Sequence, residues 1–277
     1  MKIISILKRD FGTLIKGLNY LFLFTILFMT FIYSTGCSKN NTLARLSPEV
    51  QWQSAEENFH RGRYTKAIPF YQQIILERSS VFTADAQFRL AESYFLRGGR
   101  EDFIDAIFEY QEYLRLFPDQ EFTADAQYRI AQSYAKLSLS AHFTQDDTQR
   151  AIENFTRFVE RNPQDRRVIE AYEYIAQMQI KIIEKVYQNG YIYFKMKDYP
   201  ASELYLKEII ELGNRNELEK KSMYYIALIH IDRLEEAEAK QALRHLETHF
   251  PNSKETKQIQ KRVNRMNSWF FRLFYMI

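Results

Sequence analysis

One segment of thirteen residues occurs twice in this chain, forty residues apart. Residues 82–94 read FTADAQFRLAESY and residues 122–134 read FTADAQYRIAQSY, so ten of the thirteen positions are identical. The three differing pairs are Phe88/Tyr128, Leu90/Ile130 and Glu92/Gln132. Repeats with a period of about 20 to 50 residues are typical of solenoids, whose units bury their apolar faces only by stacking on one another. The duplication therefore predicts an array of similar units.

The duplicated segment has the periodicity of a helix. Its apolar residues recur at spacings of four, three and four, and neither Gly nor Pro interrupts them. In the first copy these residues are Ala84, Phe88 and Ala91, and Phe95 directly after the copy continues the pattern. Thr83 and Thr123 are expected to cap the two helices, because threonine is a common N-cap and an Asp follows each of them two residues later.

A second helix is expected after each copy. Residues 105–117 and 150–162 both contain Ala-Ile, then an aromatic residue three positions after the Ile, and both run into a proline, Pro118 or Pro163. Proline ends a helix and restricts the residue before it to extended backbone. Each unit is therefore a pair of helices.

This pair of helices resembles the tetratricopeptide repeat. The family places a small residue and an aromatic three positions apart in the first helix, as in Ala91 and Tyr94. It places another small residue where the second helix crosses the first, here Ala67, Ala106 or Ala151, because a methyl group lets two helices approach closely. The pattern counts about five units over residues 49–253, with N-terminal units at 49–163 and C-terminal units at 168–253. The expected fold class is all-α, a right-handed superhelical solenoid of tetratricopeptide repeats.

Two units are longer than the standard repeat. The excess in the second unit contains Gly98-Gly99, and the excess in the third contains SLSAHFTQDDTQ, residues 138–149. Both are expected to form loops between the two helices of their unit, and such loops are candidate contact sites. From Val168 to Tyr191 an apolar helical pattern continues without a clear break.

The first 36 residues differ from the rest of the chain. A basic leader precedes the apolar run LFLFTILFMTFIY at 21–33, which is short for a membrane span and fits a signal-peptide core. Thr35 and Gly36 precede Cys37 as small residues do in a bacterial lipoprotein signal, although Ser34 stands where that signal prefers Leu. We therefore expect a signal peptide at 1–36, an acylated Cys37 and a tether to residue 48. An uncleaved membrane anchor is the alternative.

The charge balance gives no support to a nucleic-acid partner. The leader holds four Lys or Arg and one Asp of the chain's 38 basic and 35 acidic residues, so 34 of each remain after its removal. Nucleic-acid binding needs a basic surplus gathered on one face. Because Cys37 is the only cysteine, an intrachain disulfide is excluded as well.

No catalytic motif is found. The chain lacks a phosphate-binding glycine loop, a zinc ligand set and a nucleophile elbow, so no enzyme activity, cofactor or metal is expected. His245 and His249 have a spacing that can hold a metal, but a third ligand is not evident, and both are expected on a solvated face. Asp146 and Asp147 are interpreted as a solvated turn.

Residues 254–277 are predicted to form a last helix. It is expected to cap the open end of the final repeat, to offer an aromatic, basic surface to a partner or a membrane, or to do both. The residues proposed for that surface are Arg265, Trp269, Phe271 and Arg272.

A lipoprotein signal followed by these units resembles the BamD family of outer-membrane assembly lipoproteins. The motifs that carry this resemblance are YTKAIPFYQQII, AQFRLAESYF with AIFEYQEYLRLFP, and DDTQRAIENFTRFVERNP. The resemblance implies lipid anchoring at the periplasmic face of the outer membrane, binding to the periplasmic domains of BamA beside other assembly lipoproteins, and capture of unfolded outer-membrane proteins. The substrate-groove candidates are Trp52, Phe59, Tyr64 and Tyr71, for which a place in the repeat core is the alternative.

Two other functions share the repeats. One is a lipid-anchored tetratricopeptide scaffold of cell-wall or division complexes. The other is a cytoplasm-facing adaptor held by an uncleaved anchor. A basic leader stays on the cytoplasmic side, so even a single uncleaved span would place the repeats outside the cytoplasm.

Overall fold

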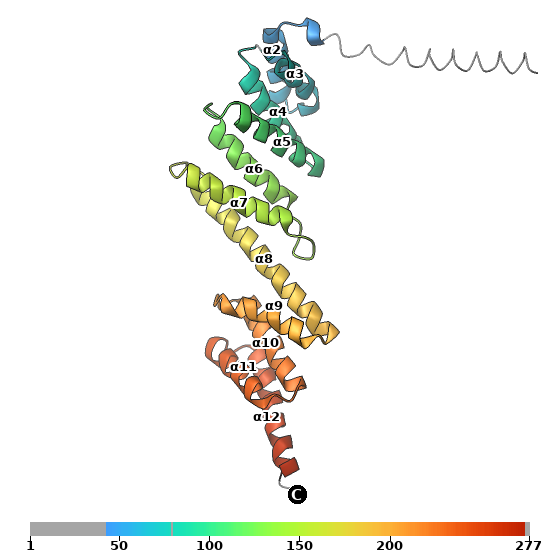
Figure 1. The fold of residues 1–277 in the computed structure, drawn as a ribbon, viewed down its shortest axis with the longest axis vertical. Helices are drawn as coiled ribbons and strands as arrows, with labels where there is room; N and C mark the ends of the chain where they lie inside the picture. The colour runs from blue at the N-terminus through green and yellow to red at the C-terminus, as the bar shows by residue number, and fades with distance from the viewer. Residues whose placement is uncertain (1–42, 79, 275–277) are drawn as a thin grey trace, which may run out of the picture. The chain divides into compact units, whose positions relative to one another are not determined.

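The computed structural model describes residues 43–78 and 80–274, and over these residues it contains eleven α-helices, one short 3-10 helix and no strand (Figure 1). The elements are η1 (Leu43–Arg45), α2 (Pro48–His60), α3 (Tyr64–Glu77), α4 (Thr83–Arg97), α5 (Arg100–Leu116), α6 (Thr123–Leu137), α7 (Asp146–Arg161), α8 (Val168–Met196), α9 (Tyr199–Glu211), α10 (Glu217–Asp232), α11 (Glu236–His249) and α12 (Lys254–Phe274). Helices α2 to α11 form five successive pairs. The predicted all-α class and the count of five units are confirmed.

The chain divides into two compact units, residues 1–86 and 87–277. In the first unit, α2 packs on α3 around a core of small and aromatic side chains. The fully buried members of this core are Ala55, Ala67, Tyr71 and Ile74. Gln51 ties η1 and Leu46 to this pair, because its side-chain amide donates to the Leu43 and Leu46 carbonyls at 3.1 and 2.9 Å.

The two copies of the duplicated segment form equal helices of 15 residues, α4 and α6. In both copies the small residues are fully buried, at Ala91 and at Ala131. The predicted threonine caps are wrong. The Thr83 and Thr123 hydroxyls donate backward to the carbonyls of Ser80 and Gln120, each at 2.7 Å, so they stabilise the preceding turn instead.

Alanines occupy the helix crossings, as the repeat pattern requires. Ala106 in α5, Ala151 in α7 and Ala239 in α11 are all fully buried. Large aromatic side chains fill the space beside them. In α5 these are Tyr110 and Tyr113, and in α7 they are Phe155 and Phe158.

Only one of the two expected loops exists. Between α4 and α5 the connection is just Gly98-Gly99, and the extra residues lengthen α5 to 17 residues. Both glycines have positive φ, 77° and 112°, which only glycine adopts without strain and which permits so short a turn. The second insertion does form a loop, residues 138–145. Lys181 and Lys185 of α8 hold it, with Nζ at 2.8 Å from the Ser138 Oγ and 3.2 Å from the His142 carbonyl oxygen.

Helix α8 is continuous for 29 residues, as the unbroken apolar pattern predicts. It ends at Met196, and the next residue, Lys197, has a φ of 62°, the left-handed conformation common after a helix. At Gly190 the backbone of α8 lies close to α9. A Cβ at this position would lie 2.7 Å from the Leu206 Cδ2, and the Ser202 hydroxyl donates to the Gly190 carbonyl at 2.9 Å.

Helix α12 packs against α10 and α11. Its Ile259, Val263 and Met266 side chains are buried, and Ile259 and Val263 join the core that contains Leu206, Ile226 and Leu246. Over the described residues, no helix combines the length and the apolarity needed to cross a membrane. The predicted signal peptide and Cys37 lie outside the described residues.

Candidate functional site

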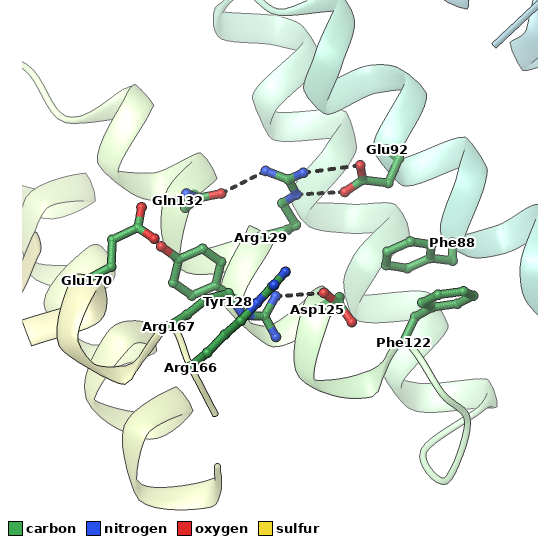
Figure 2. Close-up of a pocket in the computed structure, with 10 residues that line it drawn as sticks. All are labelled: Phe88, Glu92, Phe122, Asp125, Tyr128, Arg129, Gln132, Arg166, Arg167 and Glu170. Carbon is green, nitrogen blue, oxygen red and sulfur yellow. Dashed lines mark hydrogen bonds and ion pairs between the residues drawn. The ribbon is translucent and has the colours of Figure 1, made fainter. Parts of the chain in front are cut away.

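A cavity of about 590 Å³ lies where α4, α6 and the start of α8 meet (Figure 2). Its wall combines aromatic, acidic and guanidinium groups. The lining residues are Phe88, Glu92, Phe122, Asp125, Tyr128, Arg129, Gln132, Arg166, Arg167 and Glu170. Seven of these ten belong to the duplicated segment, so the first helices of successive units build the site together.

The positions at which the two copies differ are concentrated in this cavity. Phe88 and Tyr128 are one differing pair, Glu92 and Gln132 are another, and all four side chains line the wall. The third pair, Leu90 and Ile130, is buried in the core. Two of the three differing pairs therefore line the cavity, and the third lies in the core.

A stacking contact recurs along the units. An aromatic residue on the first helix of one unit lies against the residue just before the first helix of the next. Phe88 stacks on Phe122 with ring centroids 4.5 Å apart, and in the first unit Trp52 stacks on Phe82 at 5.2 Å. At the third occurrence Arg167 replaces the second ring, with its guanidinium carbon 5.0 Å from the Tyr128 ring centroid. The substitution exchanges an apolar wall for a cationic one, since a guanidinium also stacks on aromatic faces.

Ion pairs hold two of the three guanidinium groups in place. The Arg129 Nε lies 2.7 Å from the Glu92 Oε1, and its Nη1 donates to the Gln132 Oε1 at 2.9 Å. The buried Tyr110 hydroxyl of α5 donates to the same Glu92 oxygen. This chain of contacts connects α4, α5 and α6.

Arg167 is clamped between two carboxylates. Its Nη1 donates to the Asp125 Oδ1 at 2.6 Å, and its Nη2 and Nε donate to the Asp165 oxygens at 2.7 and 2.9 Å. The bidentate bond from Arg167 lowers the pKa of Asp165, and the same bond raises the pKa of Arg167. Both groups therefore stay charged over the physiological pH range.

Burial raises the pKa of two tyrosines at the site, Tyr110 and Tyr128. It raises the pKa of Tyr110 well above its usual value, and the Glu92 carboxylate adds to this effect. Burial, followed by the nearby Glu170 carboxylate, likewise raises the pKa of Tyr128. Both hydroxyls therefore remain neutral hydrogen-bond donors at neutral pH.

The chemistry of the site is that of recognition. Charged and aromatic groups line it, and over the described part of the chain no group of His, Cys, Asp and Glu is arranged to hold a metal ion. Fixed guanidinium groups can hydrogen-bond the polar groups of a polypeptide segment, and the stacked rings beside them can contact its apolar or cationic side chains.

The four groove candidates of the first unit form one aromatic cluster. Phe59 packs edge-on against Tyr64 at 5.5 Å and against Tyr71 at 6.4 Å, and Trp52 packs edge-on against Tyr71 at 5.9 Å. Phe59 and Tyr71 are buried in the core of α2 and α3, while Trp52 and Tyr64 are half-buried. Only Trp52 and Tyr64 thus offer part of their surface to a partner.

The other site candidates are described only in part. Arg265 is exposed on α12. Trp269, Phe271 and Arg272 belong to the same helix, but their side chains lie outside the description, as does Cys37. Their proposed roles remain predictions.

Two smaller expectations are wrong. His245 does not lie on a solvated face, because its Nε2 is 3.0 Å from an oxygen of the buried Glu219, and its ring is 4.6 Å from that of His249. Asp146 and Asp147 do not form a turn but begin α7, where acidic groups stabilise the helix N-terminus. Asp147 also pairs with Arg100 at 3.5 Å.

Sequence reasoning missed the cavity itself. Arg129, Arg166 and Arg167 were not among the expected site residues, because ion partners such as Asp125 and Arg167 lie far apart in the chain. The signal that was present is the contrast between the copies at Phe88/Tyr128 and Glu92/Gln132.

Comparison with known proteins identifies the repeats. The family model "Tetratricopeptide repeat" matches residues 85–119, 125–165 and 221–253, which hold the pairs α4/α5, α6/α7 and α10/α11. No curated protein sequence matches the chain.

Solved structures of similar architecture include a tetratricopeptide repeat protein from Parabacteroides merdae, at 13% identity over 83% of this chain and 77% of that one, with a TM-score of 0.34. The P58(IPK) TPR domain is 14% identical over 80% of this chain and 66% of that one, with a TM-score of 0.39. The MamA protein is 13% identical over 79% and 94%, with a TM-score of 0.32. At these scores the likeness adds nothing to what the repeats themselves establish.

Proposed function

We propose that this chain, which carries tetratricopeptide repeats, is a non-enzymatic scaffold that binds a polypeptide segment in the cavity between α4, α6 and α8. The observation that carries the proposal is the concentration of differences between two nearly identical helices on the wall of one cavity. Helical repeat arrays also present extended surfaces suited to polypeptide ligands.

The scaffold is proposed to be lipid-anchored through Cys37. The support is the order of the N-terminal features: a basic leader, an apolar run and small residues immediately before the chain's only cysteine. Two or more acyl chains make anchoring stable, since each buried CH₂ contributes about 0.8 kcal/mol.

The specific role proposed is assembly of β-barrel proteins into the outer membrane. It is supported by the resemblance of the three motifs described above to the BamD family. In this role the chain lies at the periplasmic face of the outer membrane, where BamA and other assembly lipoproteins are its lasting partners. Unfolded outer-membrane proteins are its transient ones.

The experiment that tests these proposals is a purification of the full-length protein from its own envelope, with mass spectrometry of the bait and of the proteins that accompany it. We expect the bait to begin at an acylated Cys37 and BamA to co-purify. The variant Cys37→Ser should lose acylation and leave the membrane fraction. An intact leader would contradict the anchor, and recovery of cell-wall or division enzymes without BamA would replace the assembly role with the alternative scaffold.

The cavity is tested separately with two phenylalanine variants. Phe122→Ala removes a half-buried ring of the cavity wall, whereas Phe108→Ala removes a ring that is 58% exposed on α5 and outside the cavity. Recovery of polypeptide partners should fall in the first variant and not in the second. Equal recovery in both would reject the cavity as the binding site.

A further inference from the structure

The exposed large apolar side chains of the first compact unit gather at one of its ends. Over the described part of this unit they are Leu46 at 38%, Val50 at 43%, Leu76 at 73% and Val81 at 87% exposure. All four belong to the end where α2 begins and α3 ends, which we call the apolar end. The opposite end, the turn between α2 and α3, carries the exposed residues Arg61, Gly62 and Arg63. The unit thus has one apolar end and one polar end.

Side-chain contacts hold the apolar end together. The Gln51 amide nitrogen, on the first turn of α2, lies 2.9 Å from the Leu46 carbonyl oxygen and 3.2 Å from the Glu77 carboxylate at the end of α3. Trp52 stacks on Phe82 with ring centroids 5.2 Å apart. Each exposed apolar residue is one of these residues or directly precedes one: Leu46 itself, Val50 before Gln51, Leu76 before Glu77, and Val81 before Phe82.

The most exposed of the four, Val81, has no apolar counterpart in the next two units. The two copies of the duplicated segment are preceded by Val81 and by Glu121. Where the stacking contact occurs a third time, with Arg167 in place of the ring, the preceding residue is Arg166. This position is therefore apolar at the first unit, acidic at the second and basic at the third.

The apolar end is also the less covered end of the repeat array. After the last repeat, α12 buries Ile259 and Val263 in the core of α10 and α11. Before the first repeat, the only described element is η1, which is three residues long and has no buried residue. Terminal units of repeat arrays usually have a polar outer face, and an exposed apolar patch indicates an interaction surface.

The chain that precedes this end is short. Cys37, which is proposed to carry the lipid, stands six residues before Leu43, the first residue that the structure describes. An extended chain spans at most about 3.6 Å per residue, so Leu43 lies within about 22 Å of the cysteine. The residues between them, SKNNT at 38–42, include no large apolar side chain that could cover Leu46 or Val50. The bilayer that holds the lipid is therefore an apolar phase within reach of the apolar end.

We propose that the apolar end docks on the surface of the lipid bilayer in which Cys37 is anchored. Its apolar side chains enter the boundary between headgroups and acyl chains, and the exposed Arg45 and Arg78 beside them face the lipid phosphates. The exposed Glu49 lies at the same end, so the contact stays at the depth of the headgroups. The inference rests on the proposed lipid anchor, and it adds the surface that orients the anchored chain.

Anchoring makes a weak contact sufficient. The tether converts docking into an intramolecular step, because it keeps the apolar end near the bilayer at a high effective concentration. A few partly inserted side chains, which would not retain an unanchored protein, then decide which end of the first unit faces the lipid.

The test compares two probes on the acylated full chain in vesicles of phosphatidylethanolamine and phosphatidylglycerol. Val81→Cys places a thiol at the apolar end, and Lys66→Cys places the matched control thiol at an exposed position on the first turn of α3, near the polar end. Cys37 does not compete for the label, because it is the only native cysteine and its sulfur carries the lipid. Each thiol is given an environment-sensitive fluorophore, and the vesicles contain lipids with a quencher just below the headgroup. We expect blue-shifted, quenched emission at residue 81 and emission as in water at residue 66.

Removal of the other apolar side chains should weaken the contact. In the variant Leu46→Ser/Val50→Ser/Leu76→Ser, quenching of the probe at residue 81 should fall at least about twofold. Leu204→Ser, which removes a 71% exposed side chain from α9, is the control and should leave the quenching unchanged. Circular dichroism confirms that both variants are folded. Undiminished quenching in the triple variant would show that these side chains do not make the contact.

Sedimentation with the vesicles separates the docking inference from the anchor on which it rests. If the chain sediments but the two probes are quenched alike, or both report water, docking by the apolar end is rejected and the anchor stands. If the chain carries no lipid and stays in solution, the anchor fails and the docking inference fails with it. If the probe at residue 81 is shielded in native envelope membranes but reports water in the vesicles, a protein covers the apolar end and docking on lipid is rejected.

Discussion

The helix pairs α6/α7 and α8/α9 bring their helices together with different side chains. In α6/α7 the crossing residue is Ala151, and the rings of Tyr128, Phe155 and Phe158 fill the space beside it. In α8/α9 the crossing residue is Gly190, and the Leu206 side chain occupies the volume that a Cβ would need. Large aromatics keep two helices far enough apart for a methyl group, whereas a leucine placed directly at the crossing leaves room only for hydrogen.

The comparison also explains which units are recognised as repeats. The family model matches α6/α7 but not α8/α9. Both are antiparallel pairs with buried contacts, so the match depends on the small-residue and aromatic spacing rather than on the pairing of helices. The fourth unit keeps the architecture while replacing the residues that define it.

The largest expected effect is loss of an aromatic from the α6/α7 core. Phe155→Ala should lower the free energy of unfolding by about 3–5 kcal/mol, because the fully buried ring leaves a cavity against Tyr128 and Tyr174. Urea unfolding followed by circular dichroism measures this. Leu204→Ala on α9, where the side chain is 71% exposed, serves as the control and should stay within about 0.5 kcal/mol. A loss in Phe155→Ala no larger than in the control would show that aromatic packing does not hold this pair.

The next effect sharpens the account of α8/α9. Gly190→Ala should cost about 1–3 kcal/mol, even though alanine gains up to about 1 kcal/mol of helix propensity, because its Cβ would clash with Leu206. The double variant Gly190→Ala/Leu206→Ala should lose less stability than the sum of the two single variants. Simple additivity of the two losses would rule out the contact as the reason for glycine.

Glu92→Gln makes the first copy equal to the second at this position. It should cost about 1–3 kcal/mol, because Arg129 and the buried Tyr110 hydroxyl both lose their charged partner. Partial exposure of Arg129 favours the lower end of that range. Adding Gln132→Glu returns a carboxylate to Arg129 from its other side and should recover part of the loss. Thermal unfolding of the single and double variants measures both steps, and no recovery would mean that the ion pair is not the cause.

A smaller effect is expected at the start of α9. The Asp198 side chain accepts a bond from the Ala201 N–H, whereas no side-chain bond caps the start of α6. Asp198→Ala should lower stability by about 1 kcal/mol, while Asp198→Asn should change it by only a few tenths. If the two substitutions had equal effects on the urea midpoint, capping would not explain the role of Asp198.

The last prediction concerns the dependence of stability on pH, which is absent at neutral pH and appears only in alkaline solution. Burial raises the pKa of Tyr110, and of Tyr187 in α8, above the value of about 10 that holds in the unfolded chain. Above pH ~10 the unfolded chain therefore loses protons that the folded chain keeps, so stability is full below that pH and falls as pH rises further. Urea midpoints between neutral pH and pH ~11 measure the fall, which Tyr110→Phe should reduce. A fall of the same size in that variant would assign the effect to other groups.

The helices of the duplicated units were predictable because the same pattern occurs twice. Their connections were less so. The spacing between Tyr94 and Ala106 is the same whether the extra residues form a loop or lengthen a helix. The positive φ values of Gly98 and Gly99 allow a two-residue turn, so the extra residues join α5. The threonine caps failed for a similar reason, since the carbonyls of Ser80 and Gln120 compete for the hydroxyls.

The cavity could be predicted only in outline. The contrast between Glu92 and Gln132 indicates that one face of the repeated helix has different surroundings in the two copies. The contact between Asp125 and Arg167 joins residues 42 positions apart, and it depends on how one unit stacks on the next. Stacking geometry is set by the side chains of two neighbours together, so neither segment specifies it alone.

The unbroken course of α8 has a mechanical consequence. At 1.5 Å per residue its 29 residues span about 43 Å. Ala171 and Met178 anchor one end in the core of α6 and α7, while Tyr187 and Phe194 press on the core around α10. Such a rod works as a lever, because a tilt of about 5° at one end displaces the other by about 4 Å over this length. Arg166 and Arg167 immediately precede α8, so one continuous helix joins the edge of the cavity to the last two repeats.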